Sequence, residues 1–172
     1  KGPRVTSQVS LPGRFVVFIP DSSHVGVSRK IEDREEPVLE EDGVGARCDG
    51  YYGDGAVTVG VGGVSEEAAR LMQVTKEALE AGVREAVVGA HLSNISAAVQ
   101  ARVESDGYSV VREFVGHGVG FEFHEAPQIP HFGKKGTGIP LAAGMVFTVE
   151  PMINLGRRDT KLLPDGWTVV TR

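Results

Sequence analysis

The segment from Gly116 to His131 constrains the fold more than any other part of the sequence. Glycines and prolines run through it, together with three of the chain's five histidines, His117, His124 and His131. Proline interrupts helical hydrogen bonding, and glycine is favoured where a second backbone comes close. Imidazole is the commonest metal ligand in proteins and titrates near neutral pH. The segment therefore predicts a strand, a turn and a second strand that carry a chemical site.

A helical zinc motif is excluded at the same place. His124 and Glu125 match the start of the pattern H-E-x-x-H, but the residue four positions after His124 is Gln128. Pro127 would also break the helix on which that motif depends. Metal ligands in this protein must therefore come from separate segments that meet in the fold.

The composition is that of a globular chain of 172 residues, 41% hydrophobic and 24% charged, with a net charge of −5. A mildly acidic chain without a basic stripe argues against nucleic acid as the main partner. The single cysteine, Cys48, cannot form an internal disulfide, which fits a cytoplasmic setting. No apolar run reaches the roughly 18 residues of a membrane span. The start at Lys1 rather than Met indicates a fragment or a processed product.

Two helices are expected in the middle of the chain. Ser65 precedes two glutamates and an apolar stripe, which predicts a capped helix from Ser65 to about Gly82. Ser93 is expected to cap a second helix that stops at Gly107. The charged stretch 29–42 predicts a solvated loop. Strands are expected on both sides of the helices, at 15–19, 56–61, 108–115, 144–150 and 167–170. This order indicates an α+β fold, with a mixed or antiparallel sheet covered by helices.

Two carboxylates stand out because of their places beside strands. Glu150 ends an apolar run and precedes Pro151, so it either faces solvent or enters a cleft, where it would need a partner. Asp54 either caps a hairpin turn or lies at the start of a strand. With His117 the two carboxylates make a permissible O/N/O ligand set. Such a set suits Mn, Fe, Co or Zn in a hydrolytic site.

Several motifs, in this order and at this spacing, resemble type I methionine aminopeptidases. They are Gly53-Asp54-Gly55, Phe114 to Gly120, Phe123 to Pro127, Ile129-Pro130-His131 and Gly144 to Met152. The resemblance implies a pita-bread fold with two pseudo-symmetric halves, here truncated at its C-terminal side. It divides the chain into an irregular N-terminal segment, residues 1–44, and an incomplete catalytic domain, residues 45–172.

The resemblance also implies a metal centre. Asp54, His117 and Glu150 would be ligands, in a family that holds two divalent ions (Co, Mn, Fe or Zn) with five ligands. The first aspartate of the family aligns with Gly43, with Asp42 as a neighbouring substitute. The chain ends at Arg172, before the strand that carries the last glutamate. We therefore expect one ion or none in this chain, and low peptidase activity.

Further roles follow from the same resemblance. A water molecule activated by the metal would attack the peptide, and its proton would pass to Glu150. His124 would position the scissile peptide and stabilise the developing oxyanion. Phe123 and Trp167 would line the pocket for the methionine side chain, and His24 would be a substrate contact. His131 is expected to be structural.

The implied function is removal of the initiator methionine from nascent polypeptides, by a monomeric cytoplasmic enzyme without membrane association and with the ribosome as a further partner. Two alternatives stay open. One is a non-catalytic pita-bread relative that binds peptides or partner proteins, which metal content would reveal. The other is a prolidase-like enzyme, which a preference for Xaa-Pro substrates would reveal.

Overall fold

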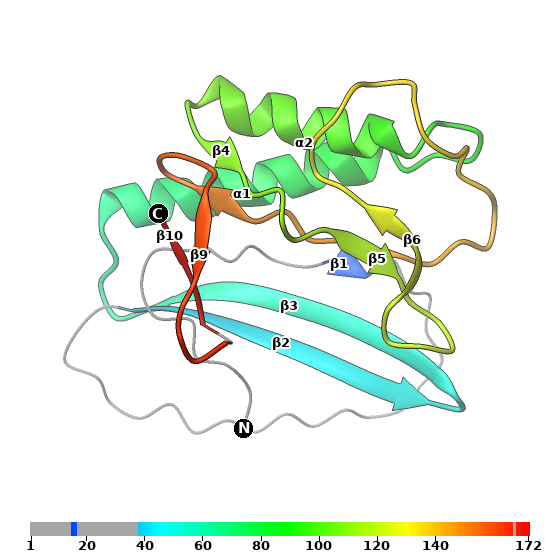
Figure 1. Cartoon of the computed structure of the whole chain (residues 1–172), viewed down its shortest axis with the longest axis horizontal. Helices are drawn as coiled ribbons and strands as arrows, with labels where there is room; N and C mark the ends of the chain where they lie inside the picture. The colour runs from blue at the N-terminus through cyan, green and yellow to red at the C-terminus, as the bar shows by residue number, and fades with distance from the viewer. Residues whose placement is uncertain (1–14, 17–37, 167) are drawn as a thin grey trace.

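The structure is a computed structural model that describes residues 15–16, 38–166 and 168–172. Figure 1 shows both helices on one side, a long hairpin on the other, and short strands between them. The elements are β1 (Phe15–Val16), β2 (Val38–Cys48), β3 (Tyr51–Val61), α1 (Glu66–Arg84), α2 (Ser93–Ser105), β4 (Ser109–Val110), β5 (Gly116–Gly118), β6 (Glu125–Ile129), β7 (Thr148–Val149), β8 (Ile153–Asn154), β9 (Thr160–Leu162) and β10 (Val169–Thr171). The expected α+β class is confirmed.

The described strands pair in separate antiparallel ladders of two, β1 with β7, β2 with β3, β4 with β8, β5 with β6 and β9 with β10. The expected strand–turn–strand geometry of the histidine-rich segment is present as β5 and β6. No helix among the described residues is long and apolar enough to cross a membrane.

The β2–β3 hairpin turns at Asp49 and Gly50, whose φ angles of 50° and 89° belong to the left-handed region. A two-residue hairpin loop needs such backbone, which aspartate and glycine tolerate. The pairing runs from Cys48–Tyr51 to Val38–Val61. The predicted solvated loop is therefore wrong for residues 38–42, which belong to β2. A charged sequence can form such a strand because the hydrogen bonds of strand pairing use the backbone N–H and C=O groups, which every residue type except proline provides.

The N-terminus of α1 is as predicted, whereas that of α2 is not. Ser65 caps α1, and its hydroxyl accepts a hydrogen bond from the Ala68 N–H at 3.1 Å. Ser93 is the first residue of α2, and Leu92 occupies the cap position without a side-chain bond. The Ser93 hydroxyl instead donates to the Thr137 carbonyl (2.6 Å) and accepts from the Thr137 N–H (2.7 Å). The Ser93 hydroxyl therefore binds the backbone of the loop around Thr137 instead of capping α2.

The two helices pack face to face around Gly82. A Cβ at this position would lie 2.7 Å from Val99 Cγ2 and 3.2 Å from Ile95 Cγ2, so glycine sets the distance between the helices. The buried apolar side chains of the two helices are Leu71, Val74, Ala78, Leu79, Ile95, Val99 and Val103. This layer is the core that supports the strands beneath it.

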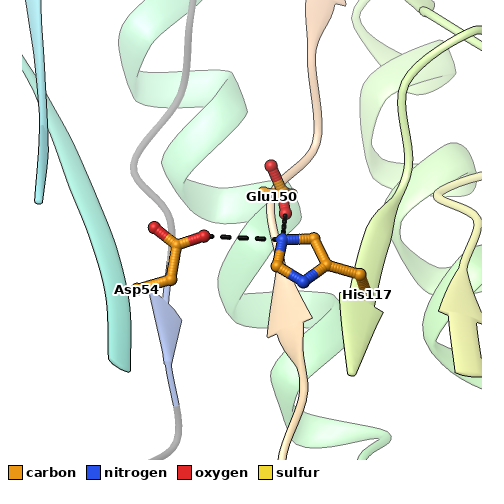
Figure 2. Close-up of side chains that lie close together, drawn as sticks. All are labelled: Asp54, His117 and Glu150. Carbon is orange, nitrogen blue, oxygen red and sulfur yellow. Dashed lines mark ion pairs between the residues drawn. The ribbon is translucent and has the colours of Figure 1, made fainter. Parts of the chain in front are cut away.

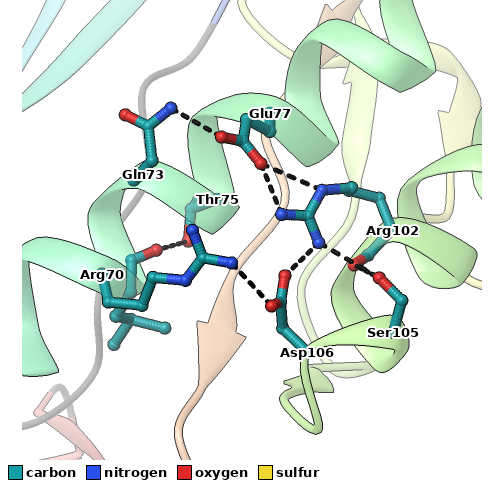
Figure 3. A network of polar contacts seen from close by, with 8 residues as sticks. Arg70, Gln73, Thr75, Glu77, Arg102, Ser105 and Asp106 are labelled. Carbon is teal, nitrogen blue, oxygen red and sulfur yellow. Dashed lines mark hydrogen bonds and ion pairs between the residues drawn. The ribbon is translucent and has the colours of Figure 1, made fainter.

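Polar contacts tie the exposed edges of the same helices together (Figure 3). Arg102 of α2 binds Glu77 of α1 and also Asp106, which receives a second ion pair from Arg70 at 2.7 Å. Hydrogen bonds from Arg102 and then Arg70 lower the pKa of Asp106. Hydrogen bonds from Gln73 and then Arg102 lower the pKa of Glu77. The network is therefore a charge-dependent link between α1 and α2.

We predict that Gly82→Ala destabilises the protein. Overpacking of a core costs about 1–3 kcal/mol, which opposes the gain of about 1 kcal/mol from the better helix propensity of alanine. Val99→Ala should relieve the overlap, so the double variant should lose less stability than the sum of the single variants. Chemical denaturation of the four proteins measures this coupling. A rise in stability for Gly82→Ala alone would contradict the close contact.

We predict that Arg102→Met lowers the melting temperature more at pH 7 than at pH 3. Because the folded-state pKa values of Glu77 and Asp106 are depressed, their contribution is complete above ordinary carboxyl pKa values of about 4 and is lost as pH falls through the lowered values. Thermal unfolding by circular dichroism measures the difference, with exposed Arg158→Met as the control. An equal loss at both pH values would assign the effect to packing of the arginine stem.

Candidate metal centre

Three side chains from distant segments converge in the interior (Figure 2). Asp54 comes from β3, His117 from β5, and Glu150 directly follows β7. The Nε2 of His117 lies 3.5 Å from Asp54 Oδ2 and 3.3 Å from Glu150 Oε1. All three side chains are buried, and each offers one ligand atom within 4.8 Å of the others. Among the described residues, this is the one group of three histidine and acidic side chains that lie close enough together to hold a metal ion.

Asp54 reaches the cluster from within the hairpin rather than from its turn. It pairs with Gly45 in the β2–β3 register and is buried, so the turn-capping interpretation is excluded. The beginning of β3 is held against the loop after β5, because the Tyr52 N–H donates to the Gly120 carbonyl at 2.7 Å. In Figure 2 the short strand β1 lies between β3 and β7. Backbone pairing thus fixes the position of this carboxylate.

The glycines on either side of His117 let three strands approach one another. A Cβ at Gly116 would lie 2.3 Å from the Thr148 carbonyl oxygen, and one at Gly118 would lie 2.2 Å from the Ala126 carbonyl oxygen. Cβ atoms do not come this close to backbone atoms, so larger residues would separate β5 from β7 or from β6. The glycines are therefore a steric requirement for bringing His117 to the carboxylates.

A backbone contact sets the tautomer of His117. Its Nδ1 lies 2.9 Å from the Gly118 carbonyl oxygen, which assigns a proton to Nδ1 and directs Nε2 toward the carboxylates. Two carboxylates and one imidazole nitrogen then face a common point. A proton on Nε2 makes this an ion-paired cluster, and an imidazole without that proton, bonded to the backbone through Nδ1, is the form that ligates metals. The three residues fit a divalent metal ion.

Two residues that the sequence did not assign to the site support Glu150. Thr148 donates a hydrogen bond to Glu150 Oε1 at 2.6 Å, and His131 Nε2 accepts one from the Glu150 N–H at 3.0 Å. Burial lowers the pKa of His131 to about 3, so its ring is neutral and can accept. The period of two in a strand could have revealed Thr148, because residues two apart share a face.

Phe123 and His124 lie beside the cluster. The His124 ring is exposed, and its centroid is 4.1 Å from that of His117 and 4.8 Å from that of Phe123. Phe123 also meets the edge of Tyr52, with 5.9 Å between centroids. A Cβ at Gly45 would lie 2.7 Å from Phe123 Cε2, so this glycine makes room for the phenyl ring. The structure thus places an exposed imidazole and an aromatic ring next to the three buried groups.

Two predicted site residues, His24 and Trp167, lie outside the described residues.

The register of the hairpin locates position 43. Gly43 of β2 pairs with Ala56 of β3, and Gly45, two residues further along β2, pairs with Asp54. Position 43 therefore lies on the strand that pairs with the strand of Asp54.

The chain is similar to known metallopeptidases in sequence and in structure. Metallopeptidase family M24 matches residues 39–171. Methionine aminopeptidase 1 of Bacillus subtilis (strain 168) is 52% identical over 128 residues, 74% of this chain and 52% of that relative. The crystal structure of methionine aminopeptidase from Rickettsia prowazekii has a TM-score of 0.75 at 47% identity, covering 78% of this chain and 54% of that one.

Prolidase from Pyrococcus furiosus is similar at a lower level, with a TM-score of 0.59 and 26% identity over 77% of this chain and 36% of that one. The chain spans about half the length of the two methionine aminopeptidases. Because the family match covers most of the chain and solved relatives share its architecture, the chain belongs to metallopeptidase family M24 and has the pita-bread fold.

Proposed function

We propose that this protein is a metal-dependent aminopeptidase that removes N-terminal methionine from nascent polypeptides. The observation that supports the proposal most is the buried cluster of Asp54, His117 and Glu150, in a chain similar to methionine aminopeptidases. We further propose that the protein is cytoplasmic and monomeric, and that it meets its substrates at the ribosome. Residues 45–172 would form the catalytic part, and residues 1–44 an additional segment.

The proposed division of labour follows the positions of the side chains. Asp54, His117 and Glu150 would hold the ion, which when bound supplies Lewis acidity near neutral pH. Glu150, whose carboxylate is hydrogen-bonded by Thr148, would receive the proton released during hydrolysis. The exposed ring of His124 would donate a hydrogen bond to the carbonyl of the scissile peptide.

The proposed methionine pocket uses the aromatic side of the site. The Phe123 ring adjoins His124, so an apolar side chain could lie against it while the peptide carbonyl meets the imidazole. A polarisable thioether makes favourable contacts with aromatic rings. We propose that Trp167 completes this pocket and that His24 contacts the substrate, both outside the described residues.

Two other functions have less support. A prolidase-like activity has structural neighbours, but the prolidase is 26% identical whereas the methionine aminopeptidase of Rickettsia prowazekii is 47% identical. A non-catalytic peptide-binding relative would have no need to bury two carboxylates beside an imidazole, because desolvating charged groups is costly even when they are paired. Both ideas remain as outcomes of the experiments that follow.

We predict that the 172-residue chain binds about one divalent ion, because the described cluster offers three ligand groups and position 43 is glycine. Titration calorimetry of the metal-free protein with Mn²⁺ measures affinity and stoichiometry. Asp54→Asn should weaken binding by more than the 10–100-fold loss typical of outer residues. Asp49→Asn in the same hairpin is the control, because asparagine also tolerates its left-handed backbone. Two tightly bound ions would contradict the prediction.

We predict slow release of methionine from a Met-Ala-Ser peptide in the presence of Co²⁺ or Mn²⁺, because a single ion lacks the joint stabilisation of attacking and leaving groups that a two-ion site supplies. Chromatographic detection of free methionine measures the rate. Glu150→Gln should abolish turnover. A rate in the usual range of about 1–1,000 s⁻¹ would contradict the single-ion expectation. Preference for an Xaa-Pro peptide would instead favour the prolidase-like function.

A further inference from the structure

We propose that Thr148 is a positioning residue that holds His117 and Glu150 in ligand geometry before any metal ion binds. The proposal rests on the metal-binding part of the proposed function, and it gives a role to a residue that lies in the Gly144–Met152 motif but is not part of the ligand cluster. Thr148 is completely buried, at 0% exposure, in the two-residue strand β7. Its hydroxyl contacts both of the segments that carry these two ligands.

The directions of the hydrogen bonds follow from the chemistry of a hydroxyl, which has one proton and two lone pairs. The proton goes to Glu150 Oε1 at 2.6 Å, a short bond to a carboxylate. The lone pairs accept the N–H of His117 at 2.9 Å. The His117 carbonyl oxygen, at 3.4 Å, is a weaker competitor for the same proton. One side chain therefore joins the backbone of one ligand to the carboxylate of the other.

This contact acts on the atoms that face the metal position. The oxygen that Thr148 binds, Oε1 of Glu150, is the one that lies 3.3 Å from His117 Nε2. At the His117 end, β5 pairs with β6 on one side. Toward β7 the described backbone pairing is an isolated bridge, Gly118 with Phe147. The hydroxyl thus provides a link that a continuous ladder between β5 and β7 would otherwise supply.

The backbone N–H of Glu150 is held by His131 and not by Thr148. Within Glu150, the Thr148 hydroxyl therefore acts on the carboxylate. His131 Nε2 accepts the Glu150 N–H. The segment around this histidine is fixed to α2, because Ser96 donates to the Pro130 carbonyl at 2.5 Å and the Gly133 N–H donates to Gln100 at 2.9 Å. Loss of the Thr148 hydroxyl should therefore release the carboxylate and the β5 backbone without unfolding the strand end.

Preorganisation matters here because metal binding requires His117 Nε2 without a proton, and the ion pairs that a protonated ring makes with the carboxylates are then lost. Hydrogen bonds from neighbouring groups keep ligand side chains in position for the metal ion. Loss of such an outer partner typically costs 10–100-fold in metal affinity. Thr148→Val removes the hydroxyl while keeping the shape of the side chain, and Thr148→Ser keeps the hydroxyl.

The experiment compares Mn²⁺ affinity, by titration calorimetry, for the metal-free 172-residue wild type, Thr148→Val and Thr148→Ser. We expect Thr148→Val to bind Mn²⁺ 10–100-fold more weakly and Thr148→Ser to stay near wild type. The matched control is Thr75→Val, which removes another buried threonine hydroxyl, one that donates to the Leu71 carbonyl within α1 at 2.8 Å. Thr75→Val should affect the melting temperature without affecting Mn²⁺ affinity.

A second readout needs no metal. In the metal-free protein, hydrogen exchange of the His117 amide should be about tenfold faster in Thr148→Val than in wild type, because its acceptor is gone. Unchanged exchange and unchanged Mn²⁺ affinity would overturn the proposal. If the wild type bound no Mn²⁺, the proposed function would fail, and the exchange rates would still decide whether Thr148 holds His117. If Thr148→Val does not fold, Thr148→Ala carries the same expectations.

Discussion

The burial of two carboxylates against one imidazole is the constraint on which the rest of this structure depends. The Nε2 of His117 lies 3.5 Å from Asp54 Oδ2 and 3.3 Å from Glu150 Oε1, and buried carboxylates of this kind are stable only when a protonated imidazole, a metal ion or hydrogen bonds balance their charge. The surrounding features serve that requirement. Glycines bring the strands together, the Gly118 carbonyl sets the imidazole tautomer, and Thr148 orients a carboxylate.

The helices contribute to the site through contact with the loops rather than through ligands. Glycine at position 82 lets α1 and α2 pack closely, and an ion network links their exposed edges. From this layer, Ser96 and Gln100 hold the segment that carries His131, which in turn accepts the N–H of Glu150. Rigidity in the helical layer is thus transmitted by a short series of hydrogen bonds to one end of the ligand cluster.

Local signals predicted the features that depend on a few adjacent residues. The cap at Ser65, the glycine stop after α2 and the strand–turn–strand geometry around His117 all follow from the conformational preferences of those residues. Prediction failed where a distant segment supplied the deciding partner. Ser93 bonds to Thr137 instead of capping its helix, and residues 38–42 form a strand because β3 pairs with them. Within the run 144–150, the structure has the short strand β7 at Thr148–Val149.

The sequence by itself determined the kind of chemistry, because the residue types and their motifs indicated an O/N/O ligand set and the relationship to methionine aminopeptidases. The resemblance also led to the expectation that Gly43 aligns with the first aspartate of the family. Only the tertiary structure decided that the three ligand atoms meet within 4.8 Å and that Thr148 and His131 support them. The reason is physical: Asp54, His117 and Glu150 are far apart in the sequence, and their distances depend on strand register and on how closely backbones approach, which no local preference specifies.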